Sequence, residues 1–299
     1  MDSICDCLTF SSVLAAFRGH LNCLEHCTPK RGETSAEAAQ SGHLACLEYC
    51  TLNGYAKHEW TSFYAALYGH LACLEHCTAH GYSKHERTSA YAAKSGQLDC
   101  LEHCTRNGYP KNKSTSTNAA RNGHLACLKH CTENEYPKHE WTSSAAARNG
   151  HLACLEHCTL NGYAKHESTS SNAALYGHLA CLEHCTALGY PKDEWTSSAA
   201  VLYGHLACLE HCTAHGYLKA GSTSANAALN GHWDCVLHCM EHDYFVSDET
   251  RRRADEYVQQ QRILAHAIVD TFLPIIHDAV YDVLALIGIL ERVWPDVFH

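Results

Sequence analysis

Positive charge is scarce in this chain. Its 299 residues include 22 lysines and arginines against 32 aspartates and glutamates, which gives a formal charge of −10 with histidine neutral. A surface that binds nucleic acid needs clustered lysine and arginine side chains, so we expect no nucleic-acid partner. One basic run, Arg251 to Arg253, is flanked by acidic residues on both sides, and we interpret it as a solvated helix start.

The chain also lacks the apolar segments of secreted and membrane proteins. Met1 to Phe10 contains Asp2 and Asp6 and has neither a basic start nor a long apolar run, so no secretory signal is expected. Twenty cysteines without such a signal predict mostly free thiols and a reducing compartment, the cytoplasm or the nucleus. The most apolar stretch, Ile263 to Leu290, predicts no membrane span, because it contains His266, Asp270, Pro274, His277, Asp278 and Asp282.

Signatures of catalysis are missing as well. There is no GxSxG, no phosphate-binding glycine loop and no HExxH. Serine and histidine are abundant, but they recur as copies of a repeat, whereas an active site needs unlike partners in one asymmetric pocket. We therefore expect a protein that is not an enzyme and that has no cofactor.

What the chain does contain is a repeat with a strict period. The motif GHLACLEHCTLNGY, Gly150 to Tyr163, recurs with few changes, and its two cysteines are four residues apart, which is a helical spacing. Periods of 20 to 50 residues indicate solenoids or propellers, and the helical spacing argues against a propeller of strands. The first cysteine of each pair comes 23 and then repeatedly 27 residues after the last: Cys23, Cys46, Cys73, Cys100, Cys127, Cys154, Cys181, Cys208 and Cys235.

Each unit predicts two short helices. In the unit from Thr142, Thr142-Ser143 supplies capping hydroxyls, alanines follow, and Gly150 ends the first helix. The second helix is expected from His151 to about Leu160, with leucines and cysteines in one apolar stripe. Two such helices cannot bury their apolar faces alone, so neighbouring units must stack into an elongated all-α solenoid.

The unit from Thr142 to Tyr163 resembles an ankyrin repeat, and the resemblance covers roughly Ser11 to Tyr244. It implies a right-handed helix-turn-helix solenoid of nine units that is a protein–protein interaction scaffold. The period of 27 is shorter than that family's 33, and such short cysteine-rich units are similar to arrays in large DNA viruses, algae and oomycetes. The matching positions are Thr142, Ala146-Ala147, Asn149 to Leu152, Cys154-Leu155, Cys158-Thr159 and Asn161-Gly162.

The cysteine pair has two interpretations. His151, Cys154 and Cys158 can face one way on a helix and so resemble three zinc ligands. The cysteines also occupy positions where ankyrin repeats bury apolar side chains, and free cysteine packs as a small hydrophobe. We favour packing and assign no metal ligand; a zinc-binding Cys/His repeat protein remains the alternative. We expect the histidine to bond to the connector of an adjacent unit.

Positions that differ between copies fall in the first helix, in two pairs four residues apart that share one face. In the ankyrin-like geometry this face is the concave surface, and tyrosine and arginine are enriched where proteins bind one another. We predict a monomer that binds a protein partner, with some acidic character, on this surface. The predicted contact residues are Phe63, Tyr64, Leu67, Tyr68, Tyr91, Lys94, Asn118, Arg121, Arg148, Asn172, Tyr176 and Tyr203.

The chain divides into a solenoid at 1–244 and a helical segment at 245–299. In the second part we expect helices from Asp248 to about Gln261, Ile263 to Phe272 and Ile275 to Val293. They are predicted to cap the last unit. Leu273-Pro274 vaguely resembles an F-box start, so the alternative is an adaptor that docks a ubiquitin ligase through 245–299. The connector tryptophans are expected to pack between connectors, and a ridge of exposed aromatic side chains is the alternative: Trp60, Trp141 and Trp195.

Overall fold

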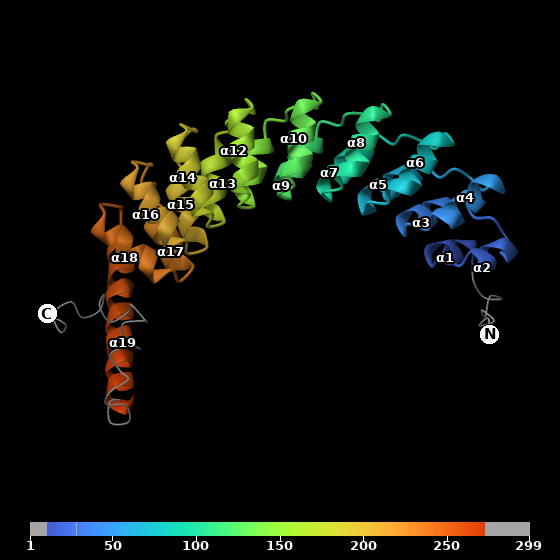
Figure 1. The fold of residues 1–299 in the computed structure, drawn as a ribbon. Coiled ribbons are helices and arrows are strands. Elements are labelled where there is room, and N and C mark those ends of the chain that lie inside the picture. The colour runs from blue at the N-terminus through green and yellow to red at the C-terminus, as the bar shows by residue number, and fades with distance from the viewer. Residues whose placement is uncertain (1–10, 28, 273–299) are drawn as a thin grey trace.

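The computed structural model describes residues 11–27 and 29–272, and all regular secondary structure in these residues is helical. The helices come in pairs, each pair being one repeat, and a longer helix, α19 (Asp248–Phe272), follows the last pair. Figure 1 shows that the pairs stack side by side into an arc, as expected for a solenoid. The all-α class and the regular helix pairs predicted from the sequence are confirmed.

The first helices of the pairs line the inner side of the arc, and the second helices lie on its outer side (Figure 1). The first helices are α1 (Ser12–Phe17), α3 (Thr34–Gln40), α5 (Thr61–Tyr68), α7 (Thr88–Lys94), α9 (Thr115–Arg121), α11 (Thr142–Arg148), α13 (Ser168–Leu175), α15 (Thr196–Leu202) and α17 (Thr223–Leu229). The second helices are α2 (Leu21–His26), α4 (Leu44–Leu52), α6 (Leu71–Ala79), α8 (Leu98–Arg106), α10 (Leu125–Glu133), α12 (Leu152–Leu160), α14 (Leu179–Ala187), α16 (Leu206–Ala214) and α18 (Trp233–Glu241).

The capping residue at the start of α11 differs from the prediction. The cap of α11 is Trp141, and the Thr142 hydroxyl donates to the carbonyl of His139 at 2.8 Å instead of accepting from the helix. This bond holds the connector against the helix start. Ala146 and Ala147 are fully buried, and such small side chains let successive first helices pack closely.

The core between the helix layers is made by leucine and cysteine. In α12, Cys154, Leu155 and Cys158 are each at most 1% exposed. Cysteine is small enough for the second helices to approach one another, and burial raises the pKa of the Cys158 thiol to about 12, so the thiol stays protonated. Among the described cysteines, Cys27 and those from Cys46 to Cys239 have free thiols, while Cys23 is disulfide-bonded. The predicted packing role is confirmed.

Each turn between paired helices depends on a glycine. Gly150 has φ +73°, a left-handed conformation in which a side chain is strained. The ring of His178, the equivalent histidine of the next repeat, lies directly on it: a Cβ on Gly150 would be 2.6 Å from Nδ1 of His178. The histidine contact thus differs from the prediction. The histidine ring packs on the glycine of the preceding repeat. In some copies the ring also lies within hydrogen-bonding distance of a first-helix carbonyl, as where Nε2 of His70 lies 3.1 Å from the carbonyl oxygen of Gln40.

A second set of polar contacts, which we call the threonine bridges, joins successive second helices. The Thr105 hydroxyl donates its one proton to the Leu101 carbonyl at 2.9 Å. It must therefore accept from Nε2 of His130 at 2.8 Å and from the hydroxyl of Tyr136 at 2.9 Å, both in the next repeat. The same arrangement recurs at Thr51, Thr78, Thr105, Thr132, Thr159, Thr186 and Thr213.

A connector lysine adds a further link between repeats. Lys111 donates to the carbonyl of Asn134 at 2.6 Å, at the end of the next second helix, and lies 5.6 Å from the ring centroid of Tyr136. A cation there complements the negative end of the helix dipole and the face of the ring. Eight lysines, from Lys30 to Lys219, make the equivalent bond.

The array ends on α19, which contacts α17 and α18 and then extends past them (Figure 1). It is one helix, where the sequence predicted a break near Arg262. Ala254 is fully buried, the ring of Tyr257 stacks on Trp233 at 5.6 Å, and Arg253 lies 5.2 Å from the Trp233 ring centroid. The third predicted helix and the F-box-like Leu273-Pro274 lie outside the described residues.

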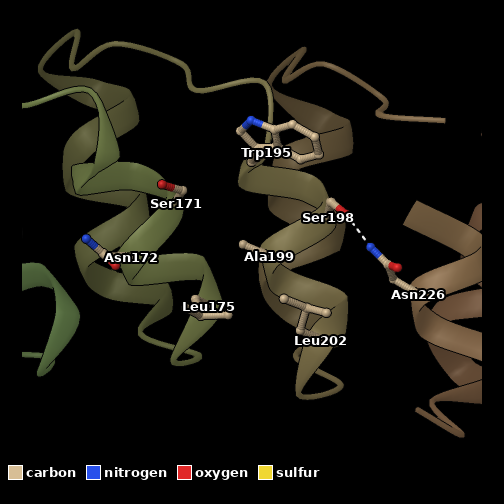
Figure 2. A pocket seen from close by; sticks show the side chains of 8 residues that line it. All are labelled: Ser171, Asn172, Leu175, Trp195, Ser198, Ala199, Leu202 and Asn226. Carbon is tan, nitrogen blue, oxygen red and sulfur yellow. Dashed lines mark hydrogen bonds between the residues drawn. The ribbon is translucent and has the colours of Figure 1, made fainter. Parts of the chain in front are cut away.

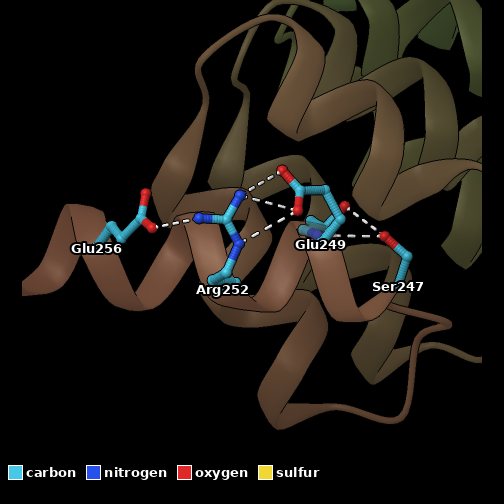
Figure 3. Close-up of polar contacts among 5 residues, drawn as sticks. Ser247, Glu249, Arg252 and Glu256 are labelled. Carbon is cyan, nitrogen blue, oxygen red and sulfur yellow. Dashed lines mark hydrogen bonds and ion pairs between the residues drawn. The ribbon is translucent and has the colours of Figure 1, made fainter.

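Arg252, in the basic run at the start of α19, forms its ion pairs within that helix. Figure 3 shows Arg252 between Glu249 and Glu256, with nitrogen–oxygen distances of 2.8 and 2.6 Å. The backbone N–H of Thr250 donates to the Ser247 hydroxyl at 3.2 Å, so Ser247 supplies the cap that the sequence assigned to Asp248 and Glu249. The interpretation of this run as an exposed helix start is confirmed.

Candidate interaction surface

The inner face of the array is a row of short helices that differ from one another only at a few positions. Helices α5, α7, α9, α11, α13, α15 and α17 contain no aspartate or glutamate. Their threonines, serines and alanines toward the core are buried, so the variable positions supply the accessible surface. We refer to these exposed and half-exposed side chains as the inner face.

The predicted contact residues fall into three groups by exposure. Six are exposed: Tyr68, Lys94, Arg121, Arg148, Tyr176 and Tyr203. Five are half-buried: Tyr64, Leu67, Tyr91, Asn118 and Asn172. One, Phe63, is 6% exposed and has no surface to offer a partner, which corrects its assignment.

Phe63 is buried because aromatic side chains of two repeats close over it. Its ring centroid is 5.0 Å from that of Trp60, 5.4 Å from that of Tyr64 and 4.7 Å from that of Tyr91. Edge-to-face and tilted contacts of this kind stabilise aromatic pairs beyond the area that they bury. Phe63 thus holds Tyr64 and Tyr91 in position, and those two retain partial exposure.

The two predicted asparagines form hydrogen bonds to the preceding first helix. Asn118 donates to the Ala90 carbonyl of the preceding first helix at 3.1 Å, and Asn172 donates to the Ser144 hydroxyl at 2.7 Å. An amide used in this way has less capacity for a partner. The sequence could not separate this role from binding, because an asparagine at this position can turn toward the neighbouring helix or toward solvent.

Three exposed cations lie at equivalent positions of consecutive repeats. Lys94, Arg121 and Arg148 end α7, α9 and α11. Lys94 lies 5.0 Å from the ring centroid of Tyr91. Arg148 lies 5.1 Å from that of Tyr176 and donates to its hydroxyl at 2.7 Å, so an aromatic ring orients the cation without neutralising it.

Beyond the cations the inner face becomes apolar. The position of Lys94, Arg121 and Arg148 is taken by Leu175, Leu202 and Leu229 in the next three repeats. The rings of Tyr176 and Tyr203 stack with their centroids 6.3 Å apart. An open hollow of about 300 Å³ lies in this part of the face. Figure 2 shows its lining side chains, with Leu175 on one helix and Leu202 and Trp195 on the next.

Trp195 is the surface residue that the sequence prediction missed. It was expected to pack between connectors. Two equivalent tryptophans lie tilted against a histidine of the next connector, with ring centroids 4.2 Å apart for Trp60 and His85 and 3.8 Å apart for Trp141 and His166, and Trp141 remains 43% exposed. At the position of those histidines the connector after Trp195 has Ala220, so the indole has no ring to stack on and is 57% exposed. The sequence held this signal, in the change from histidine to alanine.

The histidine and the cysteines of the zinc interpretation do not lie together in the described residues. Within residues 11–27 and 29–272, the structure brings together no three histidine, cysteine, aspartate or glutamate side chains in a metal-binding group. Cys154 and Cys158 face the core, while the His151 ring lies on Gly123 of the preceding repeat. The three groups that the zinc interpretation placed together therefore point to different surroundings. Over the same residues, no helix is both long and apolar enough to span a membrane.

Comparisons with known proteins found likenesses among solved structures. No protein-family model matches the chain, and no curated protein matches its sequence. A solved structure described as the crystal structure of human ASB11 ankyrin repeat domain matches with a TM-score of 0.48 and 20% sequence identity, over 53% of this chain and 85% of the other. Independently of that match, the described residues form the helix pairs that the sequence pattern predicted: they build a solenoid of short helix–turn–helix repeats.

Proposed function

We propose that this protein is a non-enzymatic scaffold that binds a protein partner on its inner face. The observation that carries the proposal is the placement of the variable residues. Side chains that repeat without change build the core and the threonine bridges, whereas most first-helix side chains that differ between copies emerge on the inner face. The second helices also vary at exposed positions, such as Leu52, Arg106 and Leu160, and these supply the outer-face control below. Exposed tyrosine, arginine and tryptophan side chains are the types that dominate binding energy at protein interfaces.

Rigidity supports the same proposal. From the second repeat on, a threonine bridge and a lysine bond tie each repeat to the next, and at most junctions a histidine also packs on a glycine, so the inner face is held in one shape before a partner arrives. A surface that is ordered in advance loses less entropy on binding than a mobile one. The open hollow beside Trp195 adds an apolar feature to this surface.

Helix α19 is proposed to close the array. A terminal repeat exposes the apolar face that an interior repeat would bury against its neighbour. The complete burial of Ala254 and the stack of Tyr257 on Trp233 support this role for the start of the 245–299 segment. We propose the boundary between solenoid and cap at residue 245, as the sequence predicted.

Selection of binders from a random peptide library displayed on phage tests the proposal without a known partner. Selected peptides should bind the unaltered protein and lose most of their affinity for a Tyr68→Ala/Arg121→Ala/Tyr203→Ala variant. The matched control changes three exposed outer-face residues, Leu52→Ala, Arg106→Ala and Leu160→Ala. Equal loss of binding in the control, or full retention in the inner-face variant, would show that the inner face is not the binding surface.

A further inference from the structure

We propose that the partner presents an extended acidic segment to the inner face. In this arrangement three carboxylates meet Lys94, Arg121 and Arg148, and an apolar side chain of the same segment enters the hollow beside Trp195. The inference rests on the proposed function and specifies the chemistry of its partner. It is carried by the charge pattern of the face, its spacing and the place where it becomes apolar.

The charge pattern of the inner face is opposite to that of the whole chain. The formal charge is −10, yet the seven first helices from α5 to α17 contain cations and no carboxylate. Within the described residues, none of the three cations forms an ion pair, whereas Arg106 on the outer α8 lies 3.6 Å from Glu102. The acidic side chains of the repeats sit mainly on the second helices and in the connectors. Among the described residues the three cations are therefore not paired with an internal acid, while the carboxylate of Asp193 lies beside the hollow, where it accepts from the Ser171 hydroxyl at 2.9 Å.

The spacing of the cations favours an extended segment. Equivalent positions of neighbouring repeats are separated by the distance between packed helices, about 10 Å. In the extended polyproline II conformation a chain advances about 3.1 Å per residue with three residues per turn, so one repeat corresponds to roughly three residues of the partner and every third side chain points the same way. Acidic residues at every third position would then meet Lys94, Arg121 and Arg148 in turn.

The apolar end of the face sets the position of an anchor. The repeat after Arg148 contributes Leu175 to the hollow, and the following one contributes Trp195 and Leu202. A leucine or phenylalanine placed about four residues beyond the last acidic residue would reach this opening. Burying such a side chain against the exposed indole of Trp195 adds an uncharged contribution that salt does not weaken.

A nucleic acid fits these features less well. Its backbone carries a charge at each nucleotide, and binding usually depends on a larger cluster of cations than three. The overall negative charge of the chain would also oppose its approach. Single-stranded DNA is therefore the competing outcome that the experiment must separate from an acidic peptide.

The test is fluorescence anisotropy with a labelled synthetic peptide that has glutamate at positions 1, 4 and 7 and leucine at position 11, in an otherwise glycine–serine chain. The full chain should bind it at 50 mM NaCl and more weakly at 500 mM. A Lys94→Gln/Arg121→Gln/Arg148→Gln variant should bind about tenfold more weakly, because each exposed ion pair contributes roughly a two- to threefold factor. The matched control, Arg106→Gln/Lys113→Gln/Lys129→Gln, removes the same charge away from the inner face and should bind as the unaltered protein does.

Two altered peptides complete the design. A peptide with glutamine in place of glutamate should bind about tenfold more weakly and should not distinguish the triple variant from the unaltered protein. A peptide with serine in place of leucine should bind more weakly to the unaltered protein and be insensitive to Trp195→Ala. Circular dichroism checks that each protein variant keeps its helical content.

Three results would overturn the inference: equal binding of the glutamate and glutamine peptides, equal weakening by the control triple, or tighter binding of a dT20 oligonucleotide that the inner-face triple abolishes. A failure of this kind is distinguishable from failure of the proposed function. If phage selection yields inner-face binders that lack acidic residues, the scaffold function stands and the acidic partner is wrong. If selected binders ignore inner-face substitutions, the proposed function itself fails.

Discussion

Replacing Thr105 by valine should destabilise the array through the next repeat as well as its own. Valine keeps the shape of threonine but removes the oxygen that accepts from His130 and Tyr136. Tyr136 is 2% exposed, so its hydroxyl would be left buried without an acceptor, at a cost of about 1–3 kcal/mol. His130 is half-buried and water can reach part of its ring, so the loss of its hydrogen bond should lower the free energy of unfolding by less than the loss at Tyr136. We expect a total loss of about 2–4 kcal/mol in the free energy of unfolding.

The assay is urea denaturation followed by circular dichroism, combined with a double-mutant cycle. Tyr136→Phe removes one donor and should cost about 1 kcal/mol, because the threonine still accepts from His130. The double variant should cost less than the sum of the two single variants, since one bond is lost in both. Tyr203→Phe is the matched control: this tyrosine is 62% exposed, and removing its hydroxyl should change stability little.

Two results would refute this reasoning. One is that Thr105→Val lowers the unfolding free energy by less than about 0.5 kcal/mol, the range of ordinary surface substitutions. Alternatively, the two substitutions could prove additive, which would mean that the hydroxyl groups of Thr105 and Tyr136 do not depend on each other. Weakening one interface can also let an array unfold in two stages, so the free energies of both stages are summed.

Three further predictions follow from the contacts between repeats. Burial lowers the pKa of the seven bridge histidines, such as His130, below the ordinary value near 6.5 and is the largest cause of the shift. Near pH 6.5 the folded state therefore binds fewer protons than the unfolded state, so its stability is full above that pH and is lost below it. The melting temperature should fall as the pH is lowered from 7.5 to 5.5, and a constant or rising melting temperature would contradict neutral histidines in the bridges. Gly150→Ala should lower the free energy of unfolding, measured by urea denaturation, by at least about 1 kcal/mol more than Gly162→Ala does. Both glycines have a left-handed backbone conformation, but only Gly150 lies against a histidine ring. Equal losses in the two variants would disprove the contact. Ala254→Glu should detach α19 and shift Trp233 fluorescence to longer wavelength, while the exposed control Gln259→Glu should leave the spectrum unchanged; unchanged spectra in both would argue against the cap.

The repeat units were predictable because their signals are local and recur. The four-residue spacing of Cys154 and Cys158 indicated a helix, Gly150 marked its start, and the alanines marked a closely packed first helix. Each signal depends on backbone preference or apolar periodicity, which act within one unit. Nine copies confirmed one another, so the helix pairs and the buried cysteines followed from the sequence alone.

The candidate site was predictable only in part. Variation between copies drew attention to Lys94, Arg121, Arg148 and Tyr203, which the structure exposes; their contact with a partner stays a prediction. The same variation included Phe63 and Asn118, because a position that varies can serve a neighbour as well as a partner. Whether Phe63 or Asn118 turns inward depends also on the neighbouring repeat: Tyr91 and the Ala90 carbonyl, their respective contacts there, lie 28 residues away along the chain.

What the sequence determined by itself was the repeating unit: two helices, a glycine turn and a cysteine–leucine core. The tertiary structure decided which polar groups join the units. Thr105, His130 and Tyr136 lie 25 and 31 residues apart along the chain, and their hydrogen bonds exist only once two repeats are stacked. The exposure of Trp195 was decided in the same way, by the absence of a ring at Ala220 in the following connector. Local preferences fix a helix, but a contact between repeats requires the distance and orientation that only packing supplies.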